Sequence, residues 1–204
     1  MHLFLIIIIV FFPIVWYDQK RTYTGNNMQK LIFLDADGTL WFPRETQRTY
    51  KPHWIYLNPE TKDNYLARLE LAPQIRETLV WFREQEYWVI CLSAHPHGHA
   101  GRPELAGKLE YFNLHDLFHD YYTSSGNDSG DKARLMREIL TNYQLSPEQA
   151  LMIGDSYTFD YCPAEQEGIS AYWIENYPWD KSQNEEVPQD ISKIQEVYQV
   201  IDLL

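Results

Sequence analysis

The chain has 204 residues, enough for one domain with a substantial hydrophobic core. Hydrophobic residues make up 45% and aromatic residues 15%, which argues against intrinsic disorder. The formal net charge of -12 argues against broad nucleic-acid binding, although a local cation and a metal ion can still create a phosphate pocket. The cysteines Cys91 and Cys162 lack metal-binding spacing and favour a reducing compartment, so we expect a cytoplasmic catalytic domain.

The N-terminal residues 3–17 are almost wholly apolar but shorter than the roughly 18 residues that span a bilayer. Lys20 and Arg21 follow this segment, the reverse of the charge order in a secretory signal. Three interpretations stay open: a short anchor giving weak membrane association, a cleaved or buried segment, or translated upstream sequence with the true start at Met28. We therefore separate residues 1–27 from a domain at 28–204.

Short apolar runs alternate with helical patterns from Met28 onward, which is typical of an α/β fold with a parallel sheet. The residues 41–71 read as a long loop or small flap, and 176–188 as a polar linker. The expected strands are 31–34, 88–92, 121–123, 150–153 and 169–174. We expect four helices. The first begins at Pro73, the second contains Leu105, Leu109 and Phe112 on one face, and the third covers 131–143 with Asp131 as its cap. The fourth is an amphipathic helix at the C-terminus, with the apolar residues Ile191, Ile194, Val197, Ile201 and Leu204.

Polar residues follow the carboxyl ends of these strands, where ligands bind in such sheets. In chain order they are Asp35 and Asp37 in the turn Asp35-Ala36-Asp37-Gly38-Thr39, then Ser93, Lys132 at a helix start, Gly154-Asp155-Ser156 and Asp160. Any one of them alone would be an ordinary turn, cap or surface residue. Their order along the chain is what indicates a single site.

Two carboxylates placed close together would repel, and a divalent cation removes that cost. Carboxylate, carbonyl and water ligands favour Mg²⁺. An ionised Asp35 can attack phosphorus to form an aspartyl-phosphate, and Asp37 can protonate the leaving oxygen and then activate water. Lys132 would neutralise the transferring oxygens, Ser93 would donate a hydroxyl, and Asp155 would complete the metal site. Asp160 would be a water-mediated ligand, or would orient Lys132 or the water molecules on the metal.

These four signals in this order resemble the haloacid dehalogenase (HAD) superfamily of phosphohydrolases, over about residues 30–174. The resemblance implies a Rossmann-like parallel sheet sandwiched by helices, with Asp35 as nucleophile and Asp37 as general acid/base. It also implies that Mg²⁺ rests on Asp35, the carbonyl of Asp37 and Asp155. The run from Asp37 to Trp41 looks like the magnesium-dependent phosphatase branch, from which Gly38 departs.

The spacing between Asp37 and Ser93 leaves little room for a large cap domain, so we expect an open site. Such a site suits a phosphorylated small molecule, sugar or protein, and we expect no nucleic-acid partner and a monomer or weak dimer. The alternatives are a phosphotransferase or mutase, disfavoured because a mutase must exclude water, and a non-catalytic phosphate-binding module.

The histidines His95, His97 and His99 follow Ser93 and admit three roles: a zinc site, a loop that contacts substrate, or a solvated loop. Zinc loops in similar proteins use several cysteines, which are missing after Ser93 here. Three aromatic residues either line the entrance of the site or pack the flap on the core: Trp41, Trp54 and Tyr56.

Overall fold

The computed structural model describes residues 30–46, 53–126, 128–175 and 187–204. The apolar segment 3–17 and the boundary at Met28 lie outside the described residues, so the three interpretations of the N-terminus stay open. Across the described ranges, none of the helices combines the length and the apolar character that crossing a membrane requires.

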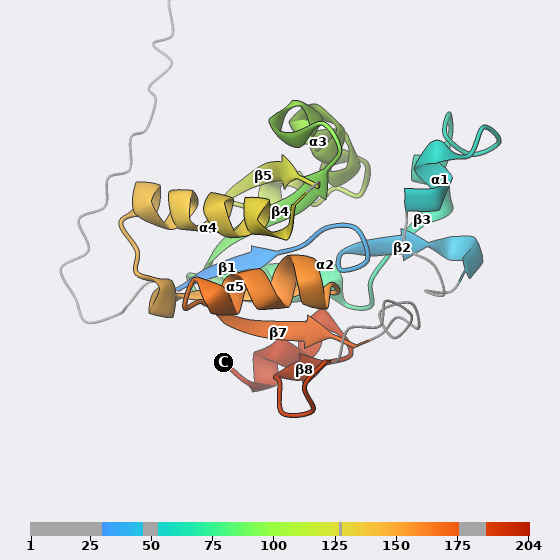
Figure 1. The fold of residues 1–204 in the computed structure, drawn as a ribbon. Coiled ribbons are helices and arrows are strands. Elements are labelled where there is room, and N and C mark those ends of the chain that lie inside the picture. The colour runs from blue at the N-terminus through green and yellow to red at the C-terminus, as the bar shows by residue number, and fades with distance from the viewer. Residues whose placement is uncertain (1–29, 47–52, 127, 176–186) are drawn as a thin grey trace, which may run out of the picture.

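The centre of the fold is a sheet of six parallel strands in the order β5-β4-β1-β6-β7-β8 (Figure 1). This arrangement confirms the predicted α/β fold and adds one strand to the five that we expected. The strands are β1 (Leu31–Leu34), β4 (Trp88–His95), β5 (Asp120–Ser125), β6 (Ala150–Gly154), β7 (Ser170–Ile174) and β8 (Lys193–Ile194).

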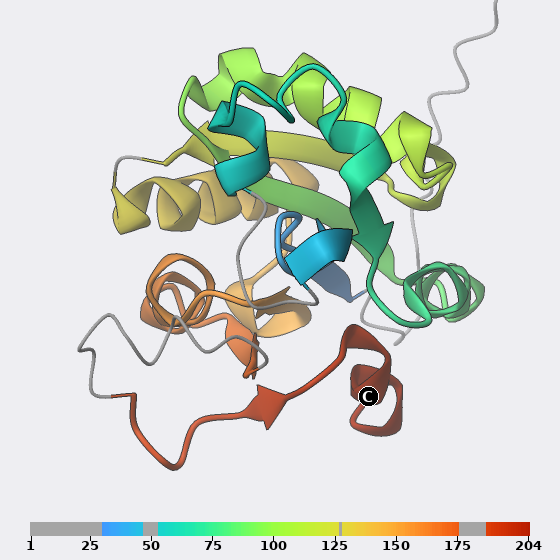
Figure 2. The ribbon, with the colours of Figure 1, turned by 90° about the vertical axis from the view of Figure 1, so that its right-hand side faces the viewer.

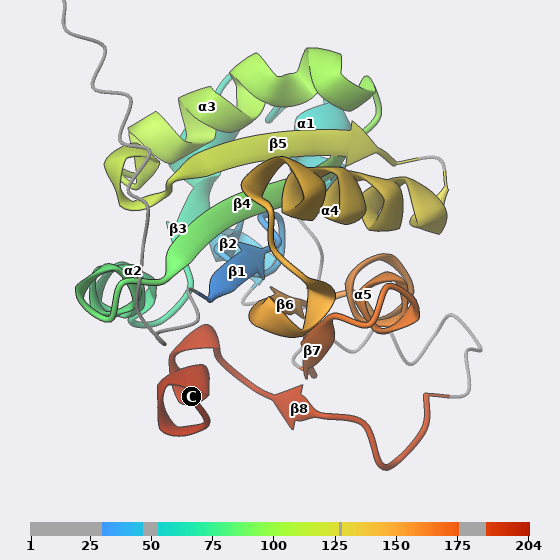
Figure 3. The same ribbon diagram turned by 90° about the vertical axis from the view of Figure 1, so that its left-hand side faces the viewer.

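Helices cover both faces of this sheet, as Figure 3 shows from its side. In the four-residue strand β1, Ile32 and Leu34 join one hydrophobic cluster and Leu31 and Phe33 join the other, and all four are fully buried. The first cluster includes residues of α2 (Ile75–Glu84), α3 (Arg102–Tyr111) and a 3₁₀ helix at Val197–Asp202; the second includes residues of α4 (Ser129–Tyr143) and α5 (Cys162–Gln166).

We predicted a long loop or a small flap at 41–71, and the described residues of this segment form the small flap, which we call the flap. Its ends, β2 (Trp41–Pro43) and β3 (Leu69–Leu71), form an antiparallel ribbon, and α1 (His53–Leu57) lies between them. The flap stands at the carboxyl end of the sheet, which faces the viewer in Figure 2. Among the described residues between β1 and β4, no large cap domain is inserted, as the sequence predicted.

The C-terminal segment does not form the predicted amphipathic helix. Ile194 instead pairs with Ile174 and adds β8 to the edge of the sheet. Val197 and Val200 are then buried at a spacing of three residues, which suits a 3₁₀ helix rather than an α-helix. The apolar residues do recur at helical spacing, but those that lie in regular elements belong to two different ones, β8 and the 3₁₀ helix.

Two element boundaries also differ from the prediction. Strand β4 continues to His95, so Ser93 lies within the strand rather than after it. Helix α4 begins at Ser129, two residues earlier than predicted, and Asp128 is its cap, accepting a hydrogen bond from the Gly130 N–H at 3.0 Å. Asp131 therefore lies in the first turn, where it forms an ion pair with Arg134.

Candidate active site

The carboxyl ends of β1, β4 and β6 meet at one edge of the sheet, beside the flap (Figure 2). Leu34 is in register with Cys91 of β4 and with Ile153 of β6, and the Asp35 N–H donates to the Ile153 carbonyl at 3.0 Å. This register brings the residues that follow the three strands to one place. It also lies between β1, whose connection runs to β4 on one side, and β6, whose connection runs to β7 on the other, which is the usual position of ligand sites in open α/β sheets.

Lys132 links two carboxylates within the protein interior. Its Nζ lies 2.7 Å from Oδ1 of Asp35 and 2.5 Å from Oδ1 of Asp160, and all three residues are at most 6% exposed. The second oxygen of Asp35 accepts a hydrogen bond from the Thr39 hydroxyl at 3.3 Å. The motif turn and helix α4 thus hold Asp35 from two sides.

Asp155 follows β6 and packs against the turn that contains Gly38. Gly38 has a φ of 100°, and a Cβ built on it would overlap the Asp155 carboxylate, with Cγ only 2.7 Å away. The backbone carbonyl of Asp155 accepts a hydrogen bond from the Trp173 indole at 3.0 Å. The close packing explains why a glycine stands at position 38.

Carboxylate oxygens of Asp35, Asp155 and Asp160 all lie within 4.8 Å of one another. Lys132 neutralises part of this negative charge, and the remainder together with the hard oxygen donors fits a divalent cation such as Mg²⁺. Asp160 already accepts bonds at both oxygens, from Lys132 and from the Ser156 N–H at 3.0 Å. Its contacts favour the orienting role over direct ligation, so Asp35 and Asp155 are the stronger ligand candidates.

Burial raises the pKa of Asp35 to about 6, the charge of Asp160 adds to the rise, and Lys132 opposes it. For Lys132, burial alone would lower the pKa, but the carboxylates of Asp160 and Asp35 outweigh burial and raise it above its usual value. The lysine is therefore a permanent cation, whereas Asp35 needs neighbouring positive charge to stay ionised near neutral pH.

Asp37 lies apart from this cluster and has partners from the flap and from α3. Its Oδ1 accepts hydrogen bonds from the Trp41 indole at 2.5 Å and from the Tyr56 hydroxyl at 2.7 Å. Its Oδ2 faces the ammonium of Lys108 at 3.5 Å. Trp41 itself is fully buried and stacks on Phe112, the residue that follows α3, with ring centroids 5.6 Å apart.

Of the two roles predicted for these aromatic residues, the structure shows packing of the flap on the core for Trp41 and Tyr56. Both residues also donate hydrogen bonds to the Asp37 carboxylate, a role that we did not predict. Trp54 lies in α1, but its side chain is outside the described part of the chain.

The region after Ser93 contributes no metal site among the described residues. Ser93 is buried at the same sheet edge, and its hydroxyl donates to the Ala94 carbonyl at 3.4 Å. The ring of His95 contacts Glu104 through Nε2 at 3.1 Å and accepts the His97 N–H at Nδ1, also at 3.1 Å. Both ring nitrogens of His95 are thus engaged within the protein, which disfavours the zinc interpretation.

Lys108 is the residue that sequence reasoning missed. It lies on the buried face of α3 with Leu105 and Leu109 and is only 4% exposed. The signal was available: position 108 falls three residues after Leu105 and four before Phe112, inside the apolar stripe. A lysine at an inward position of an amphipathic helix needs an anionic partner.

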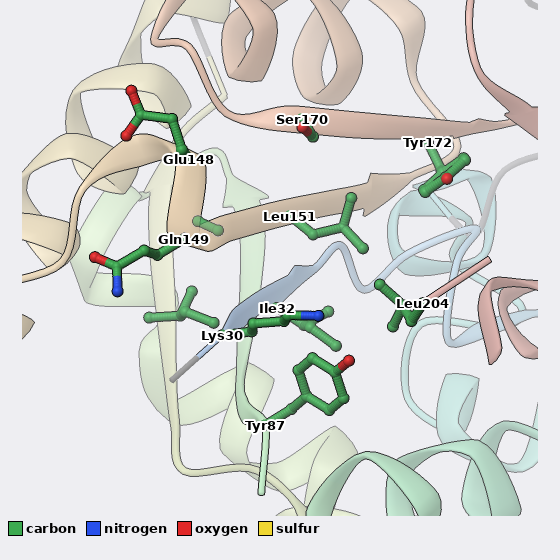
Figure 4. A pocket seen from close by; sticks show the side chains of 11 residues that line it. Lys30, Ile32, Tyr87, Glu148, Gln149, Leu151, Ser170, Tyr172 and Leu204 are labelled. Atoms are coloured by element: carbon green, nitrogen blue, oxygen red, sulfur yellow. The ribbon is translucent and has the colours of Figure 1, made fainter. Parts of the chain in front are cut away.

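A second hollow lies at the opposite end of the strands (Figure 4). It has a volume of about 250 Å³, and its lining includes Lys30, Tyr87, Leu151 and Leu204. The amino ends of parallel strands are not where such folds bind substrates, and the carboxylate cluster lies elsewhere. This hollow is therefore not the candidate active site.

Comparison with known proteins identifies a matching family. The model of the family described as haloacid dehalogenase-like hydrolase matches residues 7–174. None of the curated protein sequences matches the chain.

Solved structures of low sequence identity share the fold. They include an uncharacterized protein from Listeria monocytogenes serotype 4b, with 19% identity, a TM-score of 0.63 and coverage of 85% of this chain and 97% of that one. A HAD phosphatase from Thermococcus onnurineus has 17% identity, a TM-score of 0.61 and coverages of 86% and 97%. A 2-haloacid dehalogenase from Pseudomonas syringae pv. Tomato DC3000 has 15% identity, a TM-score of 0.58 and coverage of 86% of this chain and 97% of that one.

Proposed function

Because the chain belongs to the haloacid dehalogenase-like hydrolase family, we propose that it is a Mg²⁺-dependent phosphatase of phosphomonoesters. The observation that carries this proposal is the position of Asp35. Its carboxylate is buried, lies 2.7 Å from a buried ammonium and adjoins two further carboxylates. A nucleophile surrounded by fixed charges suits the transfer of a group that is itself strongly anionic.

The first step would form a bond between an Asp35 oxygen and phosphorus while the bond from phosphorus to the leaving oxygen breaks. Asp37, in its protonated form, would donate its proton to that leaving oxygen. In the second step Asp37 would accept a proton from water, whose oxygen attacks phosphorus and releases the Asp35 carboxylate together with inorganic phosphate. The separate surroundings of Asp35 and Asp37 support this division of roles.

Other residues would hold the charges in place. Lys132 would balance the transferring oxygens, with Asp160 fixing its position, and the Ser93 hydroxyl would donate to the phosphoryl group. Asp35 and Asp155, with the Asp37 carbonyl, would hold Mg²⁺, which when bound supplies positive charge to the phosphoryl oxygens.

The test compares hydrolysis of an aryl phosphate by the wild-type chain and by Asp35→Asn, with Mg²⁺ and with a chelator. We expect turnover only in the wild type with Mg²⁺, and a rate lower by at least about 1,000-fold in Asp35→Asn. The matched control is Asp116→Asn, because the Asp116 side chain is fully exposed and lies outside the site. Equal rates for the wild type and Asp35→Asn would sink the proposal.

A second candidate is dehalogenation, because the same buried carboxylate could displace a halide and one structural neighbour is a 2-haloacid dehalogenase. Halide departure needs no proton and would leave the proposed acid/base role of Asp37 without a purpose, so we favour the phosphatase. Halide release from 2-chloropropionate that depends on Asp35, with no phosphate release from any ester, would reverse this preference.

The small flap bears on the substrate class. Among the described residues no large cap domain is inserted between β1 and β4, which supports a phosphorylated small molecule, sugar or protein as substrate and disfavours the phosphotransferase or mutase alternative, since such enzymes must exclude water. Transfer of phosphate to an added alcohol in preference to water would support that alternative. Phosphate binding without turnover would support a non-catalytic module. We propose a monomer or weak dimer in the cytoplasm that binds no nucleic acid.

A further inference from the structure

A second buried lysine lies on the other side of the site from Lys132. Lys108 of α3 is 4% exposed, and the steps described above assign it no role. Its ammonium lies 3.5 Å from Asp37 Oδ2 and 3.3 Å from Glu104 Oε1. It also lies over the ring of Tyr56, 4.0 Å from the ring centroid. These contacts place a positive charge directly behind the predicted acid/base.

Removing an ammonium from water costs several kcal/mol of desolvation free energy, which only its interactions with partners in the protein can offset. A methionine or leucine at position 108 would continue the stripe of Leu105 and Leu109 without that cost. A buried lysine can place its ammonium in water by extending its aliphatic chain along the protein surface, but Lys108 does not, because nearly its whole side chain is covered. Packing alone therefore does not explain why position 108 carries a charge.

The two carboxylate oxygens of Asp37 have different partners. Trp41 and Tyr56 donate to Oδ1, while Lys108 faces Oδ2. Tyr56 touches both partners, since its hydroxyl bonds to the carboxylate and its ring lies under the ammonium. Glu104 holds Lys108 from the far side and is itself contacted by His95 at 3.1 Å. The carboxyl plane of Asp37 is thus fixed by contacts at both oxygens.

We propose that Lys108 is a positioning residue for Asp37: it fixes the carboxyl group in the orientation from which a proton reaches the leaving oxygen. This inference rests on the proposed phosphatase function. It predicts that losing Lys108 harms the leaving-group step and spares the phosphoryl-binding part of the site. The reason is that the contacts described for Lys108 are with Asp37, Glu104 and Tyr56, whereas Asp35 is held by Lys132.

The test uses the full chain and a series of phosphate esters, from activated aryl phosphates to an alkyl phosphate whose leaving oxygen needs a proton. General acid catalysis contributes roughly 100-fold or more, so Lys108→Met should lower kcat/KM for the alkyl phosphate by at least about tenfold. The same variant should lower kcat/KM for the most activated ester by less than about threefold, because that leaving group departs without help. Lys108→Arg should restore most of the loss.

Two controls separate positioning from structural damage. Lys62→Met makes the same substitution at an exposed flap position and should match the wild type throughout the series. Beryllium fluoride with Mg²⁺, which imitates a phosphoryl group on Asp35, should bind Lys108→Met and wild type with equal affinity.

The outcomes are distinct. An equal loss of kcat/KM across the ester series, or no loss at all, in Lys108→Met overturns the positioning role while leaving the phosphatase standing. Failure of Lys108→Met to bind beryllium fluoride also overturns it, because the damage would then extend to Asp35. A wild type that hydrolyses none of the esters removes the proposed function, and the role of Lys108 with it.

Discussion

The ammonium of Lys132 lies 2.7 Å from Oδ1 of Asp35, although 97 positions of sequence separate the two residues. Two elements produce this contact: β1 ends at the carboxylate, and α4 begins beside the same sheet edge. Because the pair is buried and shared with Asp160, we expect it to affect the stability of the protein as well as the proposed chemistry. Several measurable consequences follow from this and the neighbouring contacts.

Lys132→Met should destabilise the metal-free protein, because it leaves Asp35 and Asp160 buried together without their cation. Breaking a buried pair typically costs about 3–5 kcal/mol, which denaturant unfolding would detect. Lys193→Met is the control, since Lys193 pairs with Glu175 at 3.5 Å near the surface and should contribute less than about 1 kcal/mol. Similar losses for the two variants would contradict the role assigned to the buried pair.

The pKa of Asp35, raised to about 6 against an ordinary value of 3.8, predicts how the metal-free protein responds to pH. The folded state binds this proton more tightly than the unfolded state, so the group's stabilising contribution is complete below about pH 4 and disappears as the pH rises through 6. The free energy of unfolding should fall across that window by on the order of 3 kcal/mol relative to Asp35→Asn. A parallel pH dependence in the two proteins would refute the shift.

Mg²⁺ should compete with the same proton, because the cation needs Asp35 ionised. We expect calorimetric titration to give a weaker Mg²⁺ affinity at pH 5 than at pH 7.5, with proton release on binding at the lower pH. Asp155→Asn should lose most of the affinity at both pH values, whereas Asp116→Asn should keep it. Equal affinity at the two pH values would mean that Asp35 is not a ligand.

Gly38→Ala should unfold more easily and bind Mg²⁺ poorly. Its φ of 100° disfavours a side chain, and the added Cβ would press on the Asp155 carboxylate. We expect a loss of at least about 1–3 kcal/mol in unfolding free energy. Gly107→Ala in α3 is the matched control: its Cβ meets nothing within 4 Å, so helix propensity should make it stabilising by about 0.5–1 kcal/mol. If Gly38→Ala leaves the unfolding free energy unchanged, close packing against Asp155 does not explain the glycine at position 38.

Tyr56→Phe removes only the hydroxyl that donates to Asp37 and keeps the ring that packs on Tyr65, 5.0 Å between centroids. Burial and the Asp37 charge raise the pKa of this tyrosine well above its usual value, so it remains a proton donor to the carboxylate at every working pH. We expect kcat to fall about tenfold with little change in unfolding free energy, about 1 kcal/mol. The comparison is Tyr65→Phe, which should keep kcat within about twofold.

The sequence predicted the parts of the fold that depend on continuous patterns. The run 31–34 reads as a buried strand because all four residues are apolar, and both faces of β1 are indeed covered. The helix 131–143 was recognisable because Leu135, Ile139 and Leu140 share one face. The strand β8 was not, because its two residues carry no periodicity and its existence depends on pairing with Ile174 across the sheet edge.

In the site, too, the sequence revealed the residues that form a linear pattern but not the contacts between distant elements. Asp35, Asp37, Lys132 and Asp155 stand in a recognisable order, so the sequence pointed to them without coordinates. That order did not say that Asp37 and Asp35 would have separate partners, and it left open whether Asp160 would orient Lys132 or bind a metal through water. Those facts depend on side-chain direction and on contacts between distant elements, which a linear motif does not encode.

The flap holds Asp37 through Trp41 and Tyr56, and this attachment bears on how such an enzyme can change over evolution or by design. A segment that stands beside the site and also holds the proposed proton donor cannot be exchanged as an independent module. Grafting a different segment onto this scaffold to admit new substrates would at the same time release the donor. Substrate range and catalytic power would therefore have to be altered together, with residues equivalent to the indole and phenol retained in any transplant.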